Sequence, residues 1–345
     1  MRHRRTDGFY CRNIQKFAVK REDRMKEIKI TEFKHVKIGN AQNMEAGTGC
    51  TVLLFEDGAP AGLDVRGGGP ASRESELLKP MAAAEAVHAI LLSGGSAFGL
   101  NAAGGVMKYL EERGIGFDVG ITKVPLVCQS CLFDLGVGDF RVRPDENMGY
   151  EACVHAEEGN YQDGVVGAGT GCTVGKLHGM EFSMKSGIGS YAVQTGDLKV
   201  GAIVAVNALG DVFDWQSGKK LAGLLDKEKK QFLNSEEELY KSYEAVENRF
   251  VENTTIGAIL TNGAFTKAQL GKLAGMAHDG LARAIRPIHT TADGDSIYAV
   301  SVGTVKADQD MVGTLAAQVM AEAIKRAVLS AGAAYGFPAA GDMKK

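Results

Sequence analysis

Apolar and polar residues follow two distinct patterns along this 345-residue chain. Short apolar runs rich in β-branched residues predict strands, and apolar residues that recur every three or four positions predict helices. Interleaved helices and largely apolar strands are typical of an α/β fold whose sheets are covered on both faces. Strands are predicted at Glu27–Phe33, Thr51–Phe55, Ala61–Val65, Val200–Ala205, Ile256–Leu260 and Ile297–Val302. Helices are predicted at Glu74–Leu92, Phe98–Arg113, a segment capped by Thr266, and Gln309–Ser330.

Residues 217–252 break this pattern, because lysine and glutamate alternate there, which predicts a solvated helix or a mobile loop. The segment ends beside Asn253-Thr254-Thr255, at the start of a predicted strand. If the Asn253–Thr254 bond were cut, Thr254 would carry a hydroxyl and a free α-amine with a pKa of about 7.7–8.0. That amine could accept the hydroxyl proton, so one residue would supply nucleophile and base. The alternatives are a simple turn and strand start, or a glycosylation sequon in a secreted protein.

Composition narrows the class of protein. Apolar residues make up 45% and charged residues 23%, which is typical of a globular protein, and a net charge of −3 provides no field for nucleic acid. Six cysteines in so long a chain do not indicate a disulfide scaffold, so we expect a cytoplasmic location. Cys128 and Cys131 have metal or redox spacing, but without a second pair we expect no metal. A thioredoxin-like role would require the pair at a helix start after a strand.

The first 24 residues are basic and polar, and they lack the apolar core of a signal peptide. No later run is long and apolar enough to predict a membrane span. A more ordinary opening begins at Met25. We therefore expect translation to start at Met25, and residues 1–24 to be either a disordered tail or an extension that the native protein lacks.

Three further positions could carry chemistry. Both carboxylates of Asp293-Gly294-Asp295 can face one site, because alternate residues of an extended segment project to the same side. Two neighbouring carboxylates can orient an amine or a hydroxyl. Asn207 ends a predicted strand and could donate to an oxyanion. Lys176 follows a glycine-rich segment that lacks the phosphate-loop spacing. Ordinary turns and a solvated lysine are the alternatives, and His289 is interpreted as structural.

Two glycine-rich segments, Arg66–Pro70 and Ser93–Gly99, suggest backbone amides near a ligand, but neither fits the dinucleotide fingerprint. We therefore expect no nucleotide cofactor. The heptapeptide Ala46–Val52 recurs unchanged as Ala168–Val174, which suggests a turn-strand unit used twice.

Taken together and in this order, several motifs resemble those of a known family of self-processing aminopeptidases and amidases. That family includes the L-aminopeptidase/D-esterase, the β-aminopeptidases and the nylon-oligomer (6-aminohexanoate-oligomer) hydrolase. The resemblance covers about residues 30–335. It rests on Arg66–Pro70, Leu92–Leu100, Leu132–Asp139, Gly167–Gly171, Asn253–Ile256 and Asp293–Asp295.

The resemblance implies a single αββα domain of the N-terminal-nucleophile type over residues 25–345, which cuts itself into residues 1–253 and 254–345. It implies Thr254 as nucleophile and amine, Asn207 as oxyanion donor, and Lys176 as an assisting residue. Asp293 and Asp295 would orient Thr254, and their Asp-Gly-Asp form is closer to the nylon-oligomer hydrolase branch. Phe133 stands where several members have a tyrosine, at a position implied in substrate binding.

The implied function is hydrolysis of small amides, peptides or ω-amino-acid oligomers through an acyl-enzyme, by a cytoplasmic tetramer of cut protomers that needs no cofactor. The alternatives are an acyltransferase similar to the ornithine acetyltransferase and a non-enzymatic ligand-binding protein. The unusual segment Val127–Cys131 could alter the substrate pocket.

Overall fold

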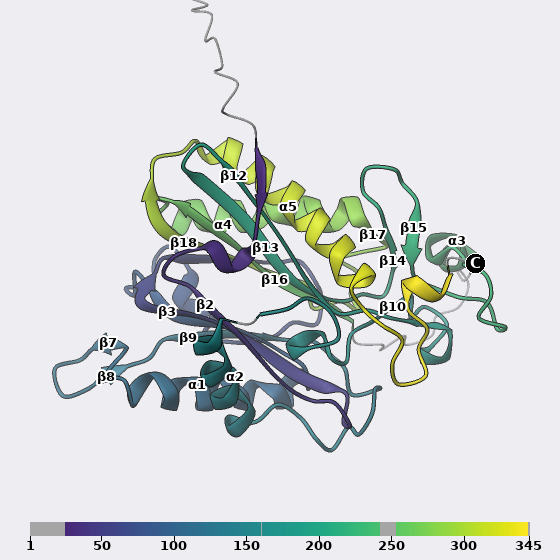
Figure 1. Ribbon diagram of the computed structural model, residues 1–345, viewed down its shortest axis with the longest axis horizontal. Coiled ribbons are helices and arrows are strands. Elements are labelled where there is room, and N and C mark those ends of the chain that lie inside the picture. The colour runs from purple at the N-terminus through teal and green to yellow at the C-terminus, as the bar shows by residue number, and fades with distance from the viewer. Residues whose placement is uncertain (1–24, 160, 242–252, 344–345) are drawn as a thin grey trace, which may run out of the picture.

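The structure is a computed structural model that describes residues 25–159, 161–241 and 253–343. Two β-sheets lie face to face in the middle of the molecule, and helices cover the outer face of each (Figure 1). The first sheet has the order β1 (Lys26–Ile28), β12 (Ile188–Thr195), β13 (Leu198–Asn207), β16 (Thr254–Gly263), β18 (Ser296–Val305) and β4 (Ala61–Val65). The second has the order β2 (Lys37–Asn43), β3 (Thr48–Ala59), β6 (Val87–Ser93), β9 (Val127–Cys131) and β5 (Ala71–Arg73).

Helices α4 (Lys267–Ala284) and α5 (Gln309–Leu329) pack on the first sheet, and α1 (Ala102–Glu111) and α2 (Glu146–Glu158) pack on the second. This αββα arrangement confirms the predicted fold class. Smaller pairings complete the described fold: β10 (Thr173–Val174) with β11 (Met184–Lys185), β7 (Phe117–Asp118) with β8 (Lys123–Val124), and β14 (Asp211–Phe213) with β15 (Lys220–Ala222) and β17 (Ile285–Arg286). The remaining described α-helix is α3 (Ser235–Lys241).

The apolar core has three layers, one between the sheets and one beneath each helix pair. Between the sheets, Leu53 and Ile90 of one sheet share a cluster with Ile203 and Ile256 of the other. Each sheet is therefore buried on both faces, which explains why its central strands are apolar throughout rather than alternating.

The capping residue and the apolar periodicity in the sequence correctly predicted the two long helices, α4 and α5. Thr266 caps α4 by accepting from the backbone N–H of Gln269, whose side chain reaches back to the cap. The last helix runs from Gln309 to Leu329, one residue shorter than predicted. Among the described residues, no helix is long and apolar enough to cross a membrane.

The helix predicted at Glu74–Leu92 is wrong. Ser75–Leu78 form a short 3₁₀ helix, and Val87–Ser93 form β6, a fully buried strand between β3 and β9. Pro80 lacks an N–H for a continuing helix. A strand buried on both faces is apolar at nearly every position, so its spacing also matches a helical template.

Two other predictions differ in part. Phe98–Arg113 begins as a 3₁₀ helix at Ser96–Asn101 before it becomes α1. Glu27–Phe33 is a strand only over Lys26–Ile28 and then turns into a 3₁₀ helix. These are differences at element ends, where local signals are weakest.

The thioredoxin-like alternative is also wrong. Cys128 and Cys131 are free, buried thiols inside β9, an interior strand of its sheet, and neither residue belongs to the first turn of a helix. Burial raises the pKa of Cys128 to about 12, so its thiol is not a nucleophile at neutral pH.

In the charged segment at residues 217–252, Lys220 is not solvated, because its Nζ lies 2.5 Å from Oδ2 of buried Asp211. Residues 242–252 lie outside the described part of the chain. The described end of the segment is α3, whose first turn carries three glutamates.

Candidate functional site

Three neighbouring strands bring the predicted site residues together. The antiparallel register of β13 and β16 puts Asn207 opposite Thr254. The parallel pairing of β16 with β18 continues upstream as a bridge between Asn253 and Asp293. Thr254 is 3% exposed, and the predicted residues Asn207, Lys176, Asp293 and Asp295 are also buried. The site is therefore a closed cluster in the uncut chain.

The carbonyl oxygen of Asn253 accepts two hydrogen bonds at the predicted cleavage point. The Thr254 hydroxyl donates to it over 2.5 Å, and the backbone N–H of Gly294 donates to it over 2.7 Å. The N–H of Asn253 donates to the Ala292 carbonyl at 2.9 Å, which holds the scissile residue from its other side. A fixed N–H aimed at this oxygen stabilises the negative charge that develops when the carbonyl is attacked.

Glycine at position 294 is required by this close approach. An added Cβ would lie 2.8 Å from the Thr254 hydroxyl oxygen and 2.7 Å from the Gly69 carbonyl oxygen. The glycine segment Arg66–Pro70 packs against the same turn, since the Gly69 N–H donates to the Asp293 carbonyl at 2.8 Å. An added Cβ on Gly67 would meet that carbonyl oxygen at 2.2 Å. This glycine segment therefore supports the site by backbone contact.

Asp295 orients the backbone next to the predicted nucleophile. Its Oδ1 accepts from the Thr255 N–H at 2.7 Å. Its Oδ2 accepts from Nδ1 of His289 at 2.8 Å and from the His289 backbone N–H at 3.3 Å. The ring of His289, interpreted as structural from the sequence, thus contacts a predicted site residue directly.

Asp293 has a different environment from Asp295. Its Oδ2 accepts from the backbone N–H and the hydroxyl of Thr290, at 2.7 and 2.6 Å. Its Oδ1 is buried and has no hydrogen-bond partner among the residues that the structure describes. Burial, and then the charge of Asp295, raise the pKa of Asp293 to about 6. Asp293 is thus able to gain and lose a proton near neutral pH.

Lys176 and Asn207 form a second buried pair. The Lys176 ammonium donates to Oδ1 of Asn207 at 2.8 Å and to its backbone carbonyl at 3.0 Å. Burial lowers the pKa of Lys176 to about 7, although the negative charge of a Cys172 thiolate or of Asp293 would raise it. Lys176 is therefore a buried group that titrates near neutral pH, rather than the solvated lysine that was the alternative.

The side-chain amide of Asn207 donates to the backbone carbonyl of Phe133 at 2.7 Å. The hydrogen bond to the scissile carbonyl comes instead from Gly294. Asn207 Nδ2 has a second N–H, which leaves one donor for a substrate oxyanion. Phe133 contributes its main chain to this arrangement, and its residue as a whole is half-buried.

The second glycine segment, Ser93–Gly99, serves packing. Buried Asp134 accepts from the Gly95 N–H and from the Thr48 hydroxyl, each at 2.7 Å, and burial raises its pKa to about 6. The two copies of the heptapeptide lie side by side, because an added Cβ on Gly171 would meet the Gly47 carbonyl oxygen at 2.4 Å. Glycine at these positions lets the backbones approach closely.

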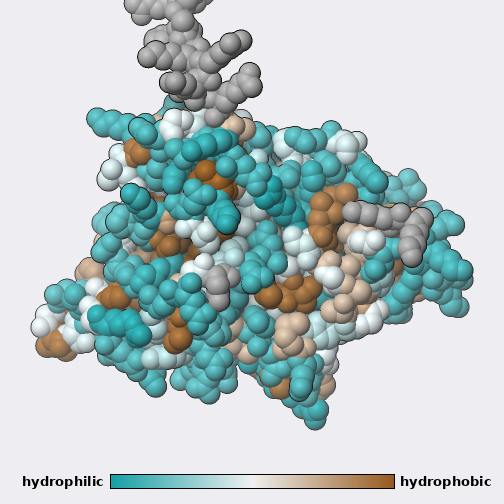
Figure 2. Space-filling model, in the orientation of Figure 1, coloured by the Kyte–Doolittle hydropathy of each residue, from teal (hydrophilic) through white to brown (hydrophobic). Residues whose placement is uncertain are grey.

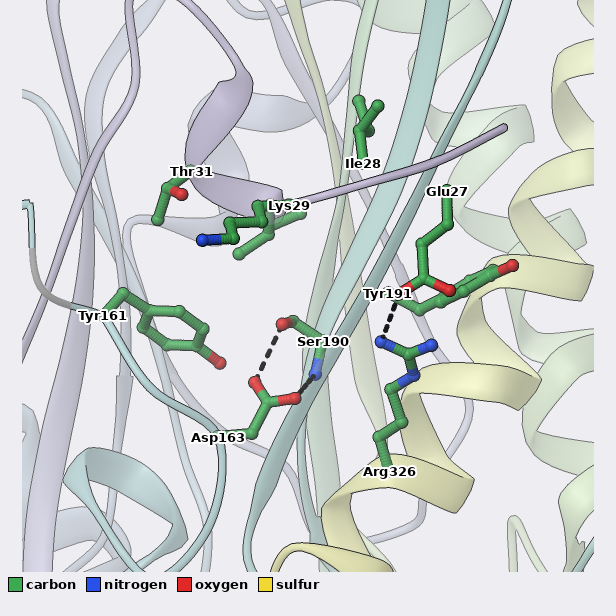
Figure 3. A pocket seen from close by; sticks show the side chains of 10 residues that line it. Glu27, Ile28, Lys29, Thr31, Tyr161, Asp163, Ser190, Tyr191 and Arg326 are labelled. Atoms are coloured by element: carbon green, nitrogen blue, oxygen red, sulfur yellow. Dashed lines mark hydrogen bonds and ion pairs between the residues drawn. The ribbon is translucent and has the colours of Figure 1, made fainter. Parts of the chain in front are cut away.

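A surface cavity of about 260 Å³ lies at β1, β12 and α5, and it contains none of the predicted site residues (Figure 3). Several of its charged groups have partners: Arg326 forms an ion pair with Glu27, and Asp163 accepts from the backbone N–H and the hydroxyl of Ser190. On the face seen in Figure 2, apolar residues are scattered in small groups among hydrophilic ones. Among the described residues, no group of three or more histidine, cysteine or acidic side chains could hold a metal ion.

Sequence reasoning missed two contributors, the Gly294 N–H and the His289 ring. A glycine between two site aspartates was a usable signal for the first, and nearness to the same pair was a weak signal for the second. Neither signal could show the contact itself.

Known proteins match almost the whole chain. The model of peptidase family S58 matches residues 29–340. An uncharacterized aminopeptidase of Mycobacterium tuberculosis (strain ATCC 25618 / H37Rv) is 36% identical over 347 residues, covering 91% of this chain and 97% of that protein. A 6-aminohexanoate-oligomer endohydrolase of Kocuria sp. (strain KY2) is 28% identical over 313 residues, covering 86% and 84%.

Solved structures share the fold. The L-aminopeptidase D-Ala-esterase/amidase of Ochrobactrum anthropi, described as a variant of the Ntn hydrolase fold, matches with a TM-score of 0.65 and 17% identity, covering 88% of this chain and 86% of its own. A β-aminopeptidase of Burkholderia sp. matches with a TM-score of 0.61 and 19% identity, covering 89% and 88%.

Proposed function

The chain belongs to peptidase family S58, a family of hydrolases that act on peptide or amide bonds, and we propose that it cuts itself between Asn253 and Thr254 to release its own nucleophile. The observation that carries this proposal is the meeting of the Thr254 hydroxyl and the Gly294 N–H at the Asn253 carbonyl oxygen. This contact supports the proposal, because self-cleavage requires a nucleophile and an oxyanion donor at one peptide bond.

In the first stage, Thr254 Oγ1 attacks the Asn253 carbonyl carbon, and its proton passes to a buried base, for which Asp293 is our candidate. The Gly294 N–H stabilises the oxyanion. The C–N bond then breaks, the Thr254 nitrogen takes up a proton, and an ester joins Asn253 to the Thr254 oxygen. Water hydrolyses this ester to leave a carboxylate on Asn253 and a free hydroxyl and amine on Thr254.

In the second stage, the Thr254 amine accepts the proton as the hydroxyl attacks a substrate amide or ester. The remaining N–H of Asn207 stabilises the oxyanion, and Lys176 fixes the Asn207 side chain. Asp295 keeps the strand start in place through Thr255. The substrate C–N or C–O bond breaks, and the amine or alcohol leaves with the proton that the Thr254 amine accepted. Water then hydrolyses the acyl-enzyme and restores the Thr254 hydroxyl.

For the substrate we propose small amides, short peptides or ω-amino-acid oligomers, with Phe133 beside the binding site. The names of two relatives support this range, because one is an aminopeptidase and the other a 6-aminohexanoate-oligomer endohydrolase. A hydrolysis screen across D-amino acid esters, α- and β-peptides and 6-aminohexanoate oligomers tests it. Hydrolysis of none of these classes by fully cut protein would contradict this range.

We also propose that the two fragments stay together, because β16 lies between β13 and β18 inside the first sheet. By analogy with the family that the sequence resembles, the cut protomers would form a cytoplasmic tetramer. Light scattering of purified protein measures the assembly, and a monomeric mass would contradict that part.

The test of self-cleavage is a denaturing gel with mass spectrometry. The 36.6 kDa chain should give two bands of about 27 and 10 kDa, and the smaller fragment should begin at Thr254. Thr254→Ala should stay intact and inactive, whereas Thr254→Ser retains a hydroxyl and should still be cut. An intact chain with full activity, or an active Thr254→Ala variant, would refute the proposal.

A further inference from the structure

We propose that His289 is a positioning residue, which holds the Asp295 carboxylate so that it orients the backbone N–H beside the nucleophile. The inference rests on the proposed function and deepens it. The contacts form one chain, from Nδ1 of His289 to Oδ2 of Asp295 at 2.8 Å, and from Oδ1 of Asp295 to the Thr255 N–H at 2.7 Å. Thr255 follows Thr254 in the chain. A displacement of Asp295 would therefore change the position of the Thr254 hydroxyl relative to the Asn253 carbonyl carbon.

The backbone conformation of His289 allows this contact. Its φ of 60° lies in the left-handed region, which few residues other than glycine adopt and in which asparagine, aspartate and histidine are enriched. In this conformation the backbone N–H and the ring nitrogen of His289 reach the same carboxylate oxygen. Strained conformations of this kind cluster at functional sites.

The surroundings of His289 hold its ring in place. The ring of His278, on α4, lies edge-on to it with centroids 4.8 Å apart. His278 Nε2 lies 3.0 Å from the Asp64 carbonyl oxygen and 3.4 Å from Oδ1 of that residue, which also accepts from Arg66. The titratable groups around His289 are thus Asp295 itself, His278, whose pKa is lowered by burial, and, behind His278, the Asp64–Arg66 pair.

This arrangement separates the roles of the two aspartates. Asp295 accepts from three N–H groups and so serves as an anchor for the backbone around it. Asp293 retains an oxygen without a partner among the described residues and is the aspartate that exchanges a proton. Two neighbouring acids held in different environments take different roles. His289 therefore acts on the reaction through Asp295 and does not contact the reacting atoms.

Two substitutions of His289 test this role, and both introduce a residue that readily adopts the positive φ of this position. His289→Gly accepts the positive φ but removes the ring. His289→Asn also accepts it and retains a side-chain N–H for Asp295. Self-cleavage is followed on gels after cell-free synthesis. We expect the glycine variant to be slower by at least about tenfold, and the asparagine variant to stay within about threefold of wild type.

A readout independent of cleavage is the Thr255 amide proton, recorded by NMR in the uncut Thr254→Ala chain. The hydrogen bond to Asp295 should give the Thr255 amide proton a downfield chemical shift. That shift should move upfield in His289→Gly and stay unchanged in His289→Asn. Wild-type cleavage rates in the glycine variant, or an asparagine variant as slow as the glycine variant with an unmoved amide, would overturn the proposal.

If His289→Gly does not fold, the test rests on the self-cleavage rate of His289→Asn. A folded His289→Asn chain that stays uncut counts against the proposed role of His289. If the wild-type chain is never cut, the proposed function fails. The Thr255 amide then still reports whether His289 holds Asp295.

Discussion

Replacing Gly294 with alanine should nearly abolish self-cleavage while leaving Thr254 itself unchanged. The added Cβ would lie 2.8 Å from the Thr254 hydroxyl oxygen and 2.7 Å from the Gly69 carbonyl oxygen, closer than real Cβ atoms come. Because the Gly69 contact is with backbone, the turn at Gly294 has to move. That movement withdraws the N–H that donates to the Asn253 carbonyl at 2.7 Å.

Loss of one oxyanion donor lowers a rate by about 10²–10³-fold, which corresponds to about 2.7–4 kcal/mol of barrier. The displaced hydroxyl should add to this loss. We therefore expect the half-time of self-cleavage of Gly294→Ala, measured on gels after cell-free synthesis, to lengthen by at least about a hundredfold.

The matched control is Gly271→Ala, in α4, where an added Cβ would meet no heavy atom of the described residues within 4 Å beyond its own stretch of helix. Alanine is favoured over glycine inside a helix, so this variant should fold and cleave as wild type does. A Gly294→Ala chain that is cut at the wild-type rate would show that the Gly294 N–H does not serve the reaction.

Three further predictions concern charge and burial. Self-cleavage should slow as the pH falls below about 6, because Asp293 then holds a proton at its raised pKa and cannot accept another, and a rate that stays constant down to about pH 4 would contradict this. Asp295→Ala should lower the free energy of unfolding by about 1–3 kcal/mol in urea titrations, since the N–H groups of Thr255 and His289 lose their acceptor, and an unchanged midpoint would argue against those bonds. Cys128 should resist thiol reagents at about pH 8 in the native protein, because burial raises its pKa to about 12, and rapid labelling would refute its placement inside β9.

The sequence predicted those parts of the fold that depend on short-range patterns. The capping pair of Thr266 and Gln269 marks the start of α4 within four residues of chain, and the apolar stripe of α5 repeats over many turns. The run after Thr254 is apolar enough to predict a buried strand by itself. The site residues, too, were named as residue types at particular spacings, and their catalytic roles stay predictions.

Patterns in the sequence show which residues are buried, but they do not show which residues they meet. The segment Val87–Ser93 is apolar throughout because both of its faces are covered, and only its pairing with β3 and β9 distinguishes it from a helix. In the same way, the sequence alone determined that a hydroxyl residue opens a strand at position 254. Tertiary structure decided that the Gly294 N–H reaches the carbonyl before it and that His289 reaches Asp295, because such contacts depend on strand register and a strained turn between residues distant in the chain.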